Sequence, residues 1–336
     1  MADDTQGDEA RELSAGVLRR ERSAIARGLN LLEDRRPSQR LQQHALLRAI
    51  AAAPRARTVG VTGPPGAGKS TLCAALARAW IARGESVGVV AVDPSSARSG
   101  GALLGDRVRI VDGGAGARPD PKLFVRSLAA GGELGGLSRS APACVDLLAA
   151  ACDVVLIETV GVGQSEVDVA SVADVTVVVV QPASGDALQF LKAGLLEIPD
   201  LVVVGKSDLG DVARRAETEL RHALSVGDQV GVHGGASVAL ASGATGEGVD
   251  ALILAIDARL LQLRSDGELT RRRRAGAIAR ALGAIHRRVG ELGVDALGGL
   301  DAVRARVERS IDEGLRAIDA ADAIVEAAVS SIRARE

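Results

Sequence analysis

Residues 58–77 read TVGVTGPPGAGKSTLCAALA. A β-branched segment leads into the pattern G-x-x-x-x-G-K-[ST] at 63–70, and an Ala/Leu run after it predicts a helix. A strand, loop and helix in this order surround an anion with backbone N–H groups and a helix N-terminus. A simple glycine turn needs neither Lys69 nor Ser70. The stretch therefore predicts a phosphate-binding loop in an α/β fold with a mostly parallel sheet.

The loop residues have distinct expected roles. Lys69 would reach the β- and γ-phosphates, and the Ser70 hydroxyl would bind Mg²⁺. The glycines let the backbone come close to the phosphates. The candidate nucleotide-binding residues of this stretch are Gly63, Pro64, Pro65, Gly66, Ala67, Gly68, Lys69, Ser70 and Thr71.

Length and composition bound the function. A chain of 336 residues with ample Ala, Val, Leu and Gly fits one large α/β domain with helical additions. A formal charge of −2 and aromatics limited to Phe124, Phe190 and Trp80 argue against a nucleic-acid partner. The cysteines Cys73, Cys144 and Cys152 are odd in number and lack C-x-x-C spacing, so they predict neither a disulfide framework nor a zinc site.

The chain is expected to be soluble and cytoplasmic, without a membrane partner, because it shows no apolar signal core and no run of about 18 apolar residues. We expect a disordered acidic tail at 1–10 and an N-terminal helical extension at 11–54. A nucleotide-binding domain follows at 55–255, and a helical region at 256–336 completes the chain.

Acidic residues follow two predicted strands. The strand at 87–92 ends in Asp93, and a Gly/Ser-rich segment after it carries Asp106; either acid alone could instead be a cap or turn residue. The strand at 154–157 ends in Glu158, followed by TVGVGQSE at 159–166. Acids at strand ends lie on the ligand side of a parallel sheet. Asp93 is therefore expected on the nucleotide side, Glu158 is a candidate metal-site residue, and Gly161 is a candidate γ-phosphate contact.

A base-recognition element is expected at Lys206-Ser207-Asp208, directly after the strand at 201–204. An Asp there accepts hydrogen bonds from guanine N1 and the exocyclic amine, whereas adenine offers an acceptor at N1 and nothing at C2. Alone, Lys-x-Asp is a common surface tripeptide, so its position carries the prediction. Ser242, Gly243 and Ala244 stand where a second base-contacting loop would be.

The C-terminal region continues at helical spacing to the end of the chain. Apolar residues between 278 and 329 need a partner surface, either of this domain or of another subunit. The run at 271–274 is four arginines; it could bind an acidic surface or form a solvated helix turn.

Taken in chain order, these motifs resemble the MeaB/ArgK family of P-loop GTPases, and the string ETVGVGQSE at 158–166 is the most specific of them. The resemblance runs from about residue 20 to the C-terminus. It rests on 63–70, 92–96, 99–107, 158–166, Gly185, Asp186, Gln189, Lys192 and 206–208.

The resemblance implies a GTPase of the SIMIBI class with N- and C-terminal helical extensions, the latter forming a homodimer. Such proteins are chaperones of adenosylcobalamin-dependent acyl-CoA mutases, above all methylmalonyl-CoA mutase. They couple GTP binding and hydrolysis to loading and protecting the cobalamin. GTP or GDP and Mg²⁺ are the implied cofactors.

The resemblance also assigns residues. Ser70, Asp93, Asp106 and Glu158 would shape the metal shell and the attacking water together with Lys69. Residues 161–166, including Gly161 and Gln164, would form a switch, and 183–192 a further switch that senses the mutase. Three features depart from the family pattern: Gly205 replaces Asn or Thr, Gly131 replaces Arg, and 113–117 is an insertion.

Other functions of the same fold class are alternatives. A metal-insertion GTPase would carry a His-rich tract, whereas His44, His222, His233 and His286 are scattered. A P-loop kinase would need an acceptor site, for which no residues stand out. A scaffold that does not hydrolyse GTP would not need Lys69. With no evident general base or arginine finger, we expect slow hydrolysis until a partner orders the switches.

Overall fold

The computed structural model describes residues 2–93, 120–129, 140–159, 169–182, 199–229 and 236–333. The chain divides into two compact units, Met1–Gln262 and Leu263–Glu336. The sequence places the corresponding boundary at 255/256, which falls inside a helix, α10 (Val249–Ser265).

The first unit is built on a sheet that has seven strands within the described residues, in the order β3-β2-β4-β1-β5-β6-β7. Every pair of neighbours is parallel. The strands are β1 (Arg57–Thr62), β2 (Val87–Asp93), β3 (Leu123–Ala129), β4 (Val154–Glu158), β5 (Val175–Val180), β6 (Leu201–Val204) and β7 (Ser237–Leu240). The predicted fold class, a mostly parallel sheet flanked by helices, is confirmed. Strand β3 was not among the predicted strands.

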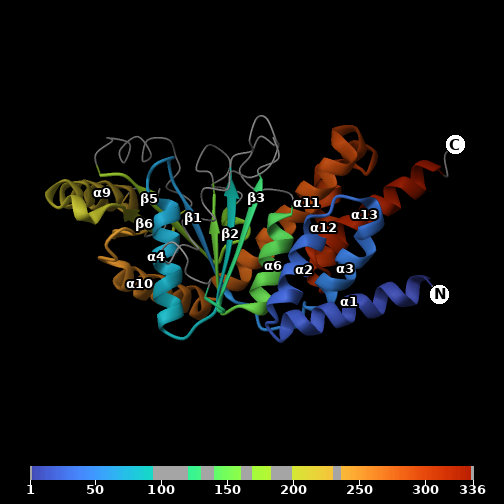
Figure 1. Cartoon of the computed structure of the whole chain (residues 1–336). Coiled ribbons are helices and arrows are strands. Elements are labelled where there is room, and N and C mark those ends of the chain that lie inside the picture. Colours follow the sequence, from blue (N-terminus) through green and yellow to red (C-terminus); the bar gives the residue numbers. More distant parts are fainter. Residues whose placement is uncertain are drawn as a thin grey trace, which may run out of the picture. The chain divides into compact units, whose positions relative to one another are not determined.

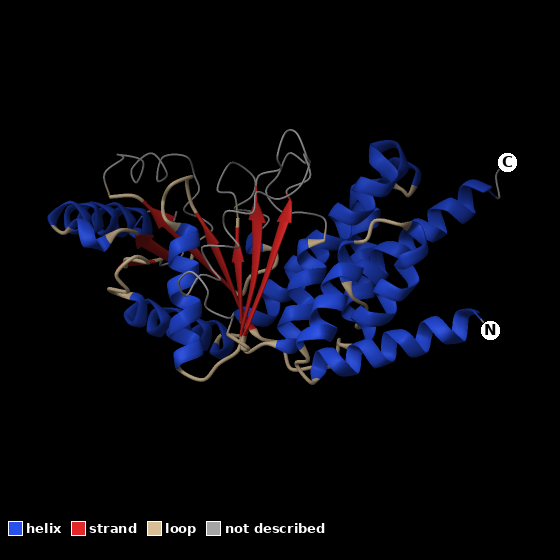
Figure 2. Cartoon of the chain, viewed as in Figure 1, coloured by secondary structure: helices blue, strands red, loops and turns tan. Residues whose placement is uncertain are grey.

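Helices cover the sheet and contribute to its core. They are α4 (Lys69–Ala82), α6 (Ala141–Ala151), α9 (Asp211–Gln229) and α10, and the short 3-10 helix η3 (Ser207–Leu209) precedes α9. Figures 1 and 2 show the strands running in one direction with helices beside them. Strands β4 and β5 are buried along their whole length and are rich in Val. This is the pattern of parallel strands covered on both faces.

Helix α4 contains the single tryptophan of the chain, Trp80. Its side chain is 1% exposed, and its indole Nε1 has no hydrogen-bond partner within the described residues. The helix begins at Lys69 of the phosphate loop, so the indole is buried at the far end of the helix that the loop starts.

The N-terminal extension consists of α1 (Ala2–Leu18), α2 (Arg22–Glu33), η1 (Pro37–Gln39) and α3 (Arg40–Ala49). The three α-helices pack on one another and on α6. Residues 2–10, expected as a disordered tail, instead form the first part of α1. The helix continues into Leu13 and Val17, which are buried. Acidic residues in a first turn also favour helix formation, which composition alone does not reveal.

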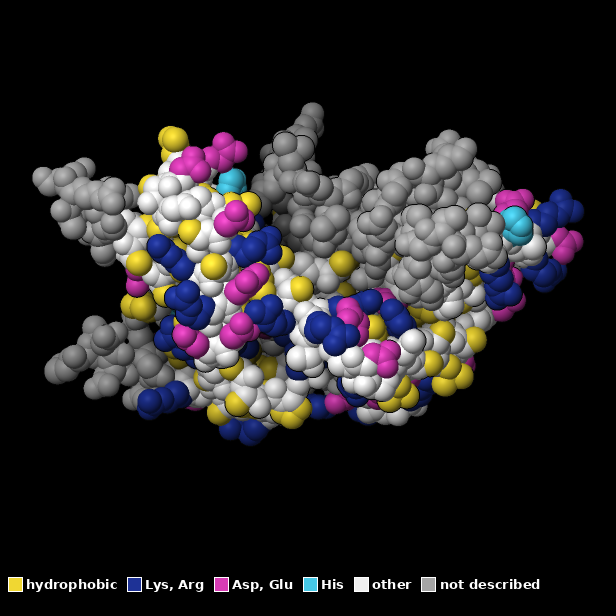
Figure 3. Space-filling view, turned by 180° about the vertical axis from the view of Figure 1, so that it is seen from behind, with side chains coloured by type: hydrophobic (Ala, Val, Ile, Leu, Met, Phe, Trp, Pro, Cys, Tyr) yellow, Lys and Arg dark blue, Asp and Glu magenta, His cyan; other side chains and the backbone are white. Residues whose placement is uncertain are grey.

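The second unit is a bundle of α11 (Glu268–Ala296), α12 (Gly299–Asp312) and α13 (Ala317–Arg333). Its own core includes Ile278, Ile285, Val303, Val307 and Ile324, so the repeated apolar positions cover one another within the unit. In the arginine run, Arg271 pairs with Glu268 and Arg274 with Asp312. Basic and acidic side chains are likewise interspersed on the face shown in Figure 3.

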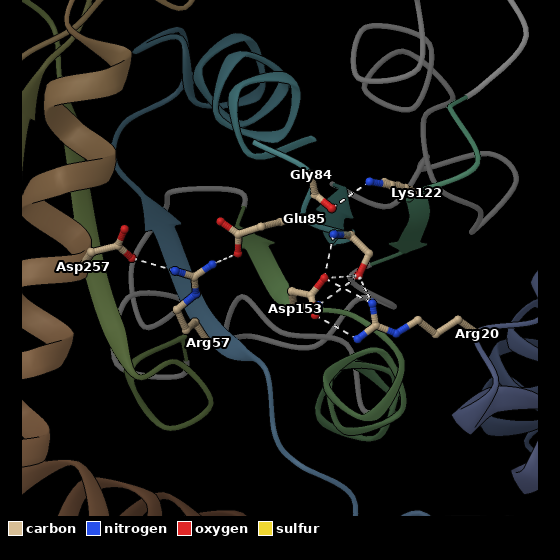
Figure 4. A network of polar contacts seen from close by, with 8 residues as sticks. Arg20, Arg57, Gly84, Glu85, Lys122, Asp153 and Asp257 are labelled. Carbon is tan, nitrogen blue, oxygen red and sulfur yellow. Dashed lines mark hydrogen bonds and ion pairs between the residues drawn. The ribbon is translucent and has the colours of Figure 1, made fainter. Parts of the chain in front are cut away.

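A polar network lies at the amino-terminal edge of the strands (Figure 4). Asp153 accepts hydrogen bonds from Ser86 N at 2.8 Å, Ser86 Oγ at 2.7 Å and Arg20 Nη2 at 2.8 Å. Arg20 has a φ of 62°, a left-handed conformation that costs energy for a residue with a side chain. Beside it, Arg57 of β1 pairs with Glu85 and with Asp257 of α10. The network joins the N-terminal extension and α10 to the sheet.

The ion pair between Asp153 and Arg20 should make the free energy of unfolding depend on pH. Burial raises the pKa of this carboxyl, but hydrogen bonds from Arg20 and Ser86 outweigh it and lower the pKa to about 2, from 3.8. A depressed pKa stabilises the fold above the unfolded-state pKa, and the contribution disappears as pH falls toward 2. With the side chain partly exposed, we expect about 1 kcal/mol.

Thermal unfolding of the wild type and Asp153→Asn, followed from pH 7 to pH 2, measures this contribution. The wild type should unfold at the higher temperature near neutral pH, and the gap between the two should close as pH falls below about 4. A gap that stays constant down to pH 2 would contradict the assignment.

Candidate functional site

The loop between β1 and α4 has the conformation that its glycines require. Gly63, Gly66 and Gly68 have φ values of 136°, 76° and 93°, a region that glycine enters at no steric cost. A Cβ on Gly63 would lie 2.1 Å from the Val179 carbonyl oxygen. The loop therefore packs against the end of β5 with no room for a side chain at its first residue.

Lys69 is folded back over this loop. Its ammonium donates to the carbonyl oxygens of Gly63 at 2.9 Å and Pro64 at 3.2 Å, and the residue is 7% exposed. The positive charge is thus held within the loop, where a bound phosphate would meet it. Helix α4 begins at Lys69, so the last two residues of the 63–70 pattern lie in its first turn rather than before it.

Ser70, in the first turn of α4, meets Glu158 at the end of β4. The Ser70 hydroxyl donates to Glu158 Oε1 at 2.5 Å, and Glu158 is 4% exposed. The pairing of Val61 with Glu158 in the β1–β4 register brings the end of β4 beside the loop. A hydroxyl and a carboxylate are oxygen ligands of the kind that Mg²⁺ prefers, so this donor set fits the ion.

A pocket of about 250 Å³ adjoins the loop. Its lining consists of Ala67, Gly68, Thr71, Leu72, Val179, Gly205, Lys206, Asp208, Ala241, Ser242, Gly243 and Ala244. The predicted base-contacting residues therefore share one pocket with part of the phosphate loop. Sequence reasoning missed Leu72 of α4, Val179 of β5 and Ala241, the residue after β7.

Asp208 is oriented by Ser242. The Ser242 hydroxyl donates to Asp208 Oδ1 at 2.6 Å and accepts from the Thr245 backbone N–H at 3.2 Å. Ser242 is 1% exposed, so its hydroxyl has a fixed environment. Lys206, next to Asp208, has a φ of 57°. Strained backbone of this kind occurs where surrounding structure imposes it, often at ligand sites.

The absence of a side chain at Gly205 has a steric reason. Its backbone N–H donates to the Val180 carbonyl at 2.9 Å, and a Cβ would lie 2.9 Å from the Ala67 carbonyl oxygen and 3.2 Å from Val179 Cγ1. The end of β6 thus lies directly against the phosphate loop. A side chain such as Asn would require the loop to shift.

Gly243 is packed still more tightly than Gly205, against the backbone of α4. A Cβ there would lie 2.6 Å from the Leu72 backbone N and 2.7 Å from the Thr71 carbonyl oxygen. Because backbone atoms cannot give way cheaply, Gly243→Ala should displace the 242–244 loop from α4. We expect guanine-nucleotide affinity to fall about 10-fold or more, with a loss of about 1–3 kcal/mol in stability.

The neighbouring Gly246 offers a matched control. A Cβ on Gly246 meets nothing within 4 Å, although its φ is 82°. Gly246→Ala should therefore cost stability through backbone strain while leaving nucleotide affinity within about 3-fold. Calorimetric titration and thermal unfolding of both variants check this. Equal effects on affinity would show that crowding against α4 is not the cause.

The remaining predicted residues are described only in part. Asp93 ends β2, as expected, but its side chain, and all of Asp106, Gly131, Gly161 and Gln164, lie outside the described residues. So do the segments 113–117, 161–166 and 183–192. No group of three or more His, Cys, Asp or Glu that could hold a metal occurs in the described part.

The three cysteines are buried and form no disulfide. Burial raises the pKa of the Cys144 and Cys152 thiols to about 12. A thiol that stays protonated is a poor nucleophile and metal ligand, so these two side chains act as core residues. Separately, none of the described helices is long and apolar enough to cross a membrane.

Comparison with known proteins identifies relatives. A family model described as "Methylmalonyl Co-A mutase-associated GTPase MeaB" matches residues 25–292. A probable GTPase of Mycobacterium bovis is 44% identical over 229 residues, covering 67% of both chains. The mouse protein named methylmalonic aciduria type A homolog, mitochondrial, is 36% identical over 247 residues, covering 67% of this chain and 58% of the mouse chain.

Among solved structures, one described as "LAO/AO transport system kinase" superposes with a TM-score of 0.66 at 26% identity. The match covers 94% of this chain and 96% of the other. The similarity therefore extends over nearly the whole of both chains.

Proposed function

Because the chain belongs to the MeaB family of methylmalonyl-CoA mutase-associated GTPases, we propose that it loads and protects the cobalamin of an adenosylcobalamin-dependent acyl-CoA mutase. Methylmalonyl-CoA mutase is the first candidate. GTP hydrolysis is the activity of the family, and the chaperone role is what this chain would do with it.

One observation carries the nucleotide assignment: the pocket that contains Asp208 and Ser242 also contains Ala67 and Gly68 of the phosphate loop. A purine held by Asp208 would have its phosphates beside Lys69. Guanine can donate to Asp208 from its N1–H and its C2 amine, whereas adenine has no donor at either position and would add nothing to the hydrogen bond from Ser242. The pocket therefore favours guanine over adenine.

The loop residues carry out most of the proposed mechanism. Backbone N–H groups of the loop and the N-terminus of α4 would hold the phosphates. Lys69 would leave the Gly63 and Pro64 carbonyls to neutralise the charge on the β- and γ-phosphates. Ser70 and Glu158 would hold Mg²⁺, which when bound supplies charge neutralisation at the phosphates.

We propose that Asp93, Asp106, Gly161 and Gln164 complete the site and position the attacking water. Hydrolysis would be slow until the mutase orders the segments 161–166 and 183–192. We further propose that the chain forms a homodimer through 256–336 and acts in the cytoplasm, where its buried cysteine thiols stay reduced.

The proposal is tested by measuring phosphate release from GTP with and without purified methylmalonyl-CoA mutase. We expect slow release alone, acceleration by the mutase, and inorganic phosphate as the product in both cases. Transfer of the phosphoryl group to another acceptor would favour a kinase. If the mutase changed neither GTP binding nor the rate of phosphate release, the chaperone role would be overturned and the GTPase activity would stand.

A further inference from the structure

Gln181, the first residue after β5, touches the outer turn of the phosphate loop. Its side-chain Nε2 donates to the Pro65 carbonyl oxygen at 3.4 Å. The same nitrogen lies 3.0 Å from the position that a Cβ on Gly66 would occupy. Neither the motif at 63–70 nor the base element includes this residue.

Carbonyl groups of three consecutive loop residues are thereby bound by side chains. Lys69 donates to Gly63 and Pro64 at 2.9 and 3.2 Å, and Gln181 donates to Pro65. When Lys69 turns to a phosphate, it gives up its two carbonyls. The contact of Gln181 can remain, because the Gln181 amide is neutral and comes from the end of β5 rather than from the loop or α4.

Holding the Pro65 carbonyl also sets the direction of the next N–H group. In a trans peptide the C=O and N–H bonds point to opposite sides, so the Gly66 N–H points away from Gln181. Pro64 and Pro65 have no N–H, and the Ala67 N–H is turned to the Pro64 carbonyl at 3.2 Å. Gly66 is therefore the donor that residues 64–67 can offer an anion.

We propose that Gln181 is a positioning residue that presets the Gly66 N–H for a nucleotide phosphate. The inference rests on the guanine-nucleotide site proposed above and adds a residue to it. Within residues 64–67, two prolines and the inward-turned Ala67 leave the Gly66 N–H as the group whose orientation matters for an anion.

The test compares ligands that differ in phosphate number. Gln181→Met keeps the side-chain length but removes the donor, and Gln42→Met on α3 controls for the chemical change. We expect the Kd for GDP to rise about 3- to 10-fold in Gln181→Met, as loss of one hydrogen bond predicts. GMP lacks the β-phosphate that the loop would hold, so its Kd should stay within about 2-fold of the wild-type value.

Hydrogen exchange of the Gly66 amide gives a second readout, since an unfixed peptide should exchange faster in Gln181→Met without nucleotide. An unchanged Kd for GDP, or equal losses for GDP and GMP, would overturn the inference, because a general disturbance of the pocket affects both ligands alike. If the wild type bound neither ligand, the nucleotide assignment itself would fail, and this inference with it.

Discussion

Lys69→Ala should lower the rate of GTP hydrolysis at saturating GTP by about 100-fold or more, the size expected for losing one charged contact to a transferring phosphoryl group. The ammonium is already held at the loop by the Gly63 and Pro64 carbonyls, and it exchanges these two acceptors for phosphate oxygens when a nucleotide binds. Affinity should fall as well, because the phosphates lose a positive charge at close range.

Phosphate release and calorimetric titration measure the two effects separately. Lys69→Met, which keeps the length of the side chain without the charge, distinguishes loss of charge from loss of packing. Thermal unfolding shows whether either variant keeps its fold. A variant that is folded and turns over GTP within about 3-fold of the wild type would contradict the role given to Lys69.

Asp208→Asn should change the base preference of the site from guanine to xanthine. Asp208 accepts from the N1–H and the exocyclic amine of guanine, whereas xanthine carries a carbonyl at C2 and needs a donor there. We expect GTP affinity to fall about 100-fold or more and XTP to bind more tightly than GTP, because the Asn amide N–H group would face the C2 amine of guanine, donor against donor. Competition binding with GTP, XTP and ATP measures the order.

Ser242→Ala provides the comparison for Asp208→Asn. It removes the hydroxyl that donates to Asp208 Oδ1 at 2.6 Å but leaves the carboxylate in place. Affinity for GTP should fall about 3- to 10-fold with the guanine preference kept. If Asp208→Asn bound GTP and XTP as the wild type does, Asp208 would not be the base-reading residue.

The local parts of the site could be predicted from the sequence. The spacing of the motif at 63–70 predicts the phosphate loop. Glu158 and Asp208 each follow a run of Val and Ile or Leu that predicts a buried strand. Parallel strands bring their carboxyl ends to one edge. The Ser70–Glu158 contact therefore follows from two motifs that lie far apart in the chain.

Contacts set by packing could not be predicted in this way. Nothing in the sequence shows that a Cβ on Gly205 would lie 2.9 Å from the Ala67 carbonyl oxygen. Gln181 is one polar residue at the end of a strand, and its contact with Pro65 depends on how β5 lies beside the loop. Strand β3 was missed because Arg126 and Ser127 interrupt its apolar pattern.

The buried Trp80 has a practical consequence. The chain contains one tryptophan and no tyrosine, so nearly all of its ultraviolet emission comes from a single indole at the end of α4. That helix starts at Lys69, which makes the emission an unlabelled optical report on the helix that follows the nucleotide loop. Stopped-flow fluorescence could follow ligand arrival on the native chain, without an attached dye.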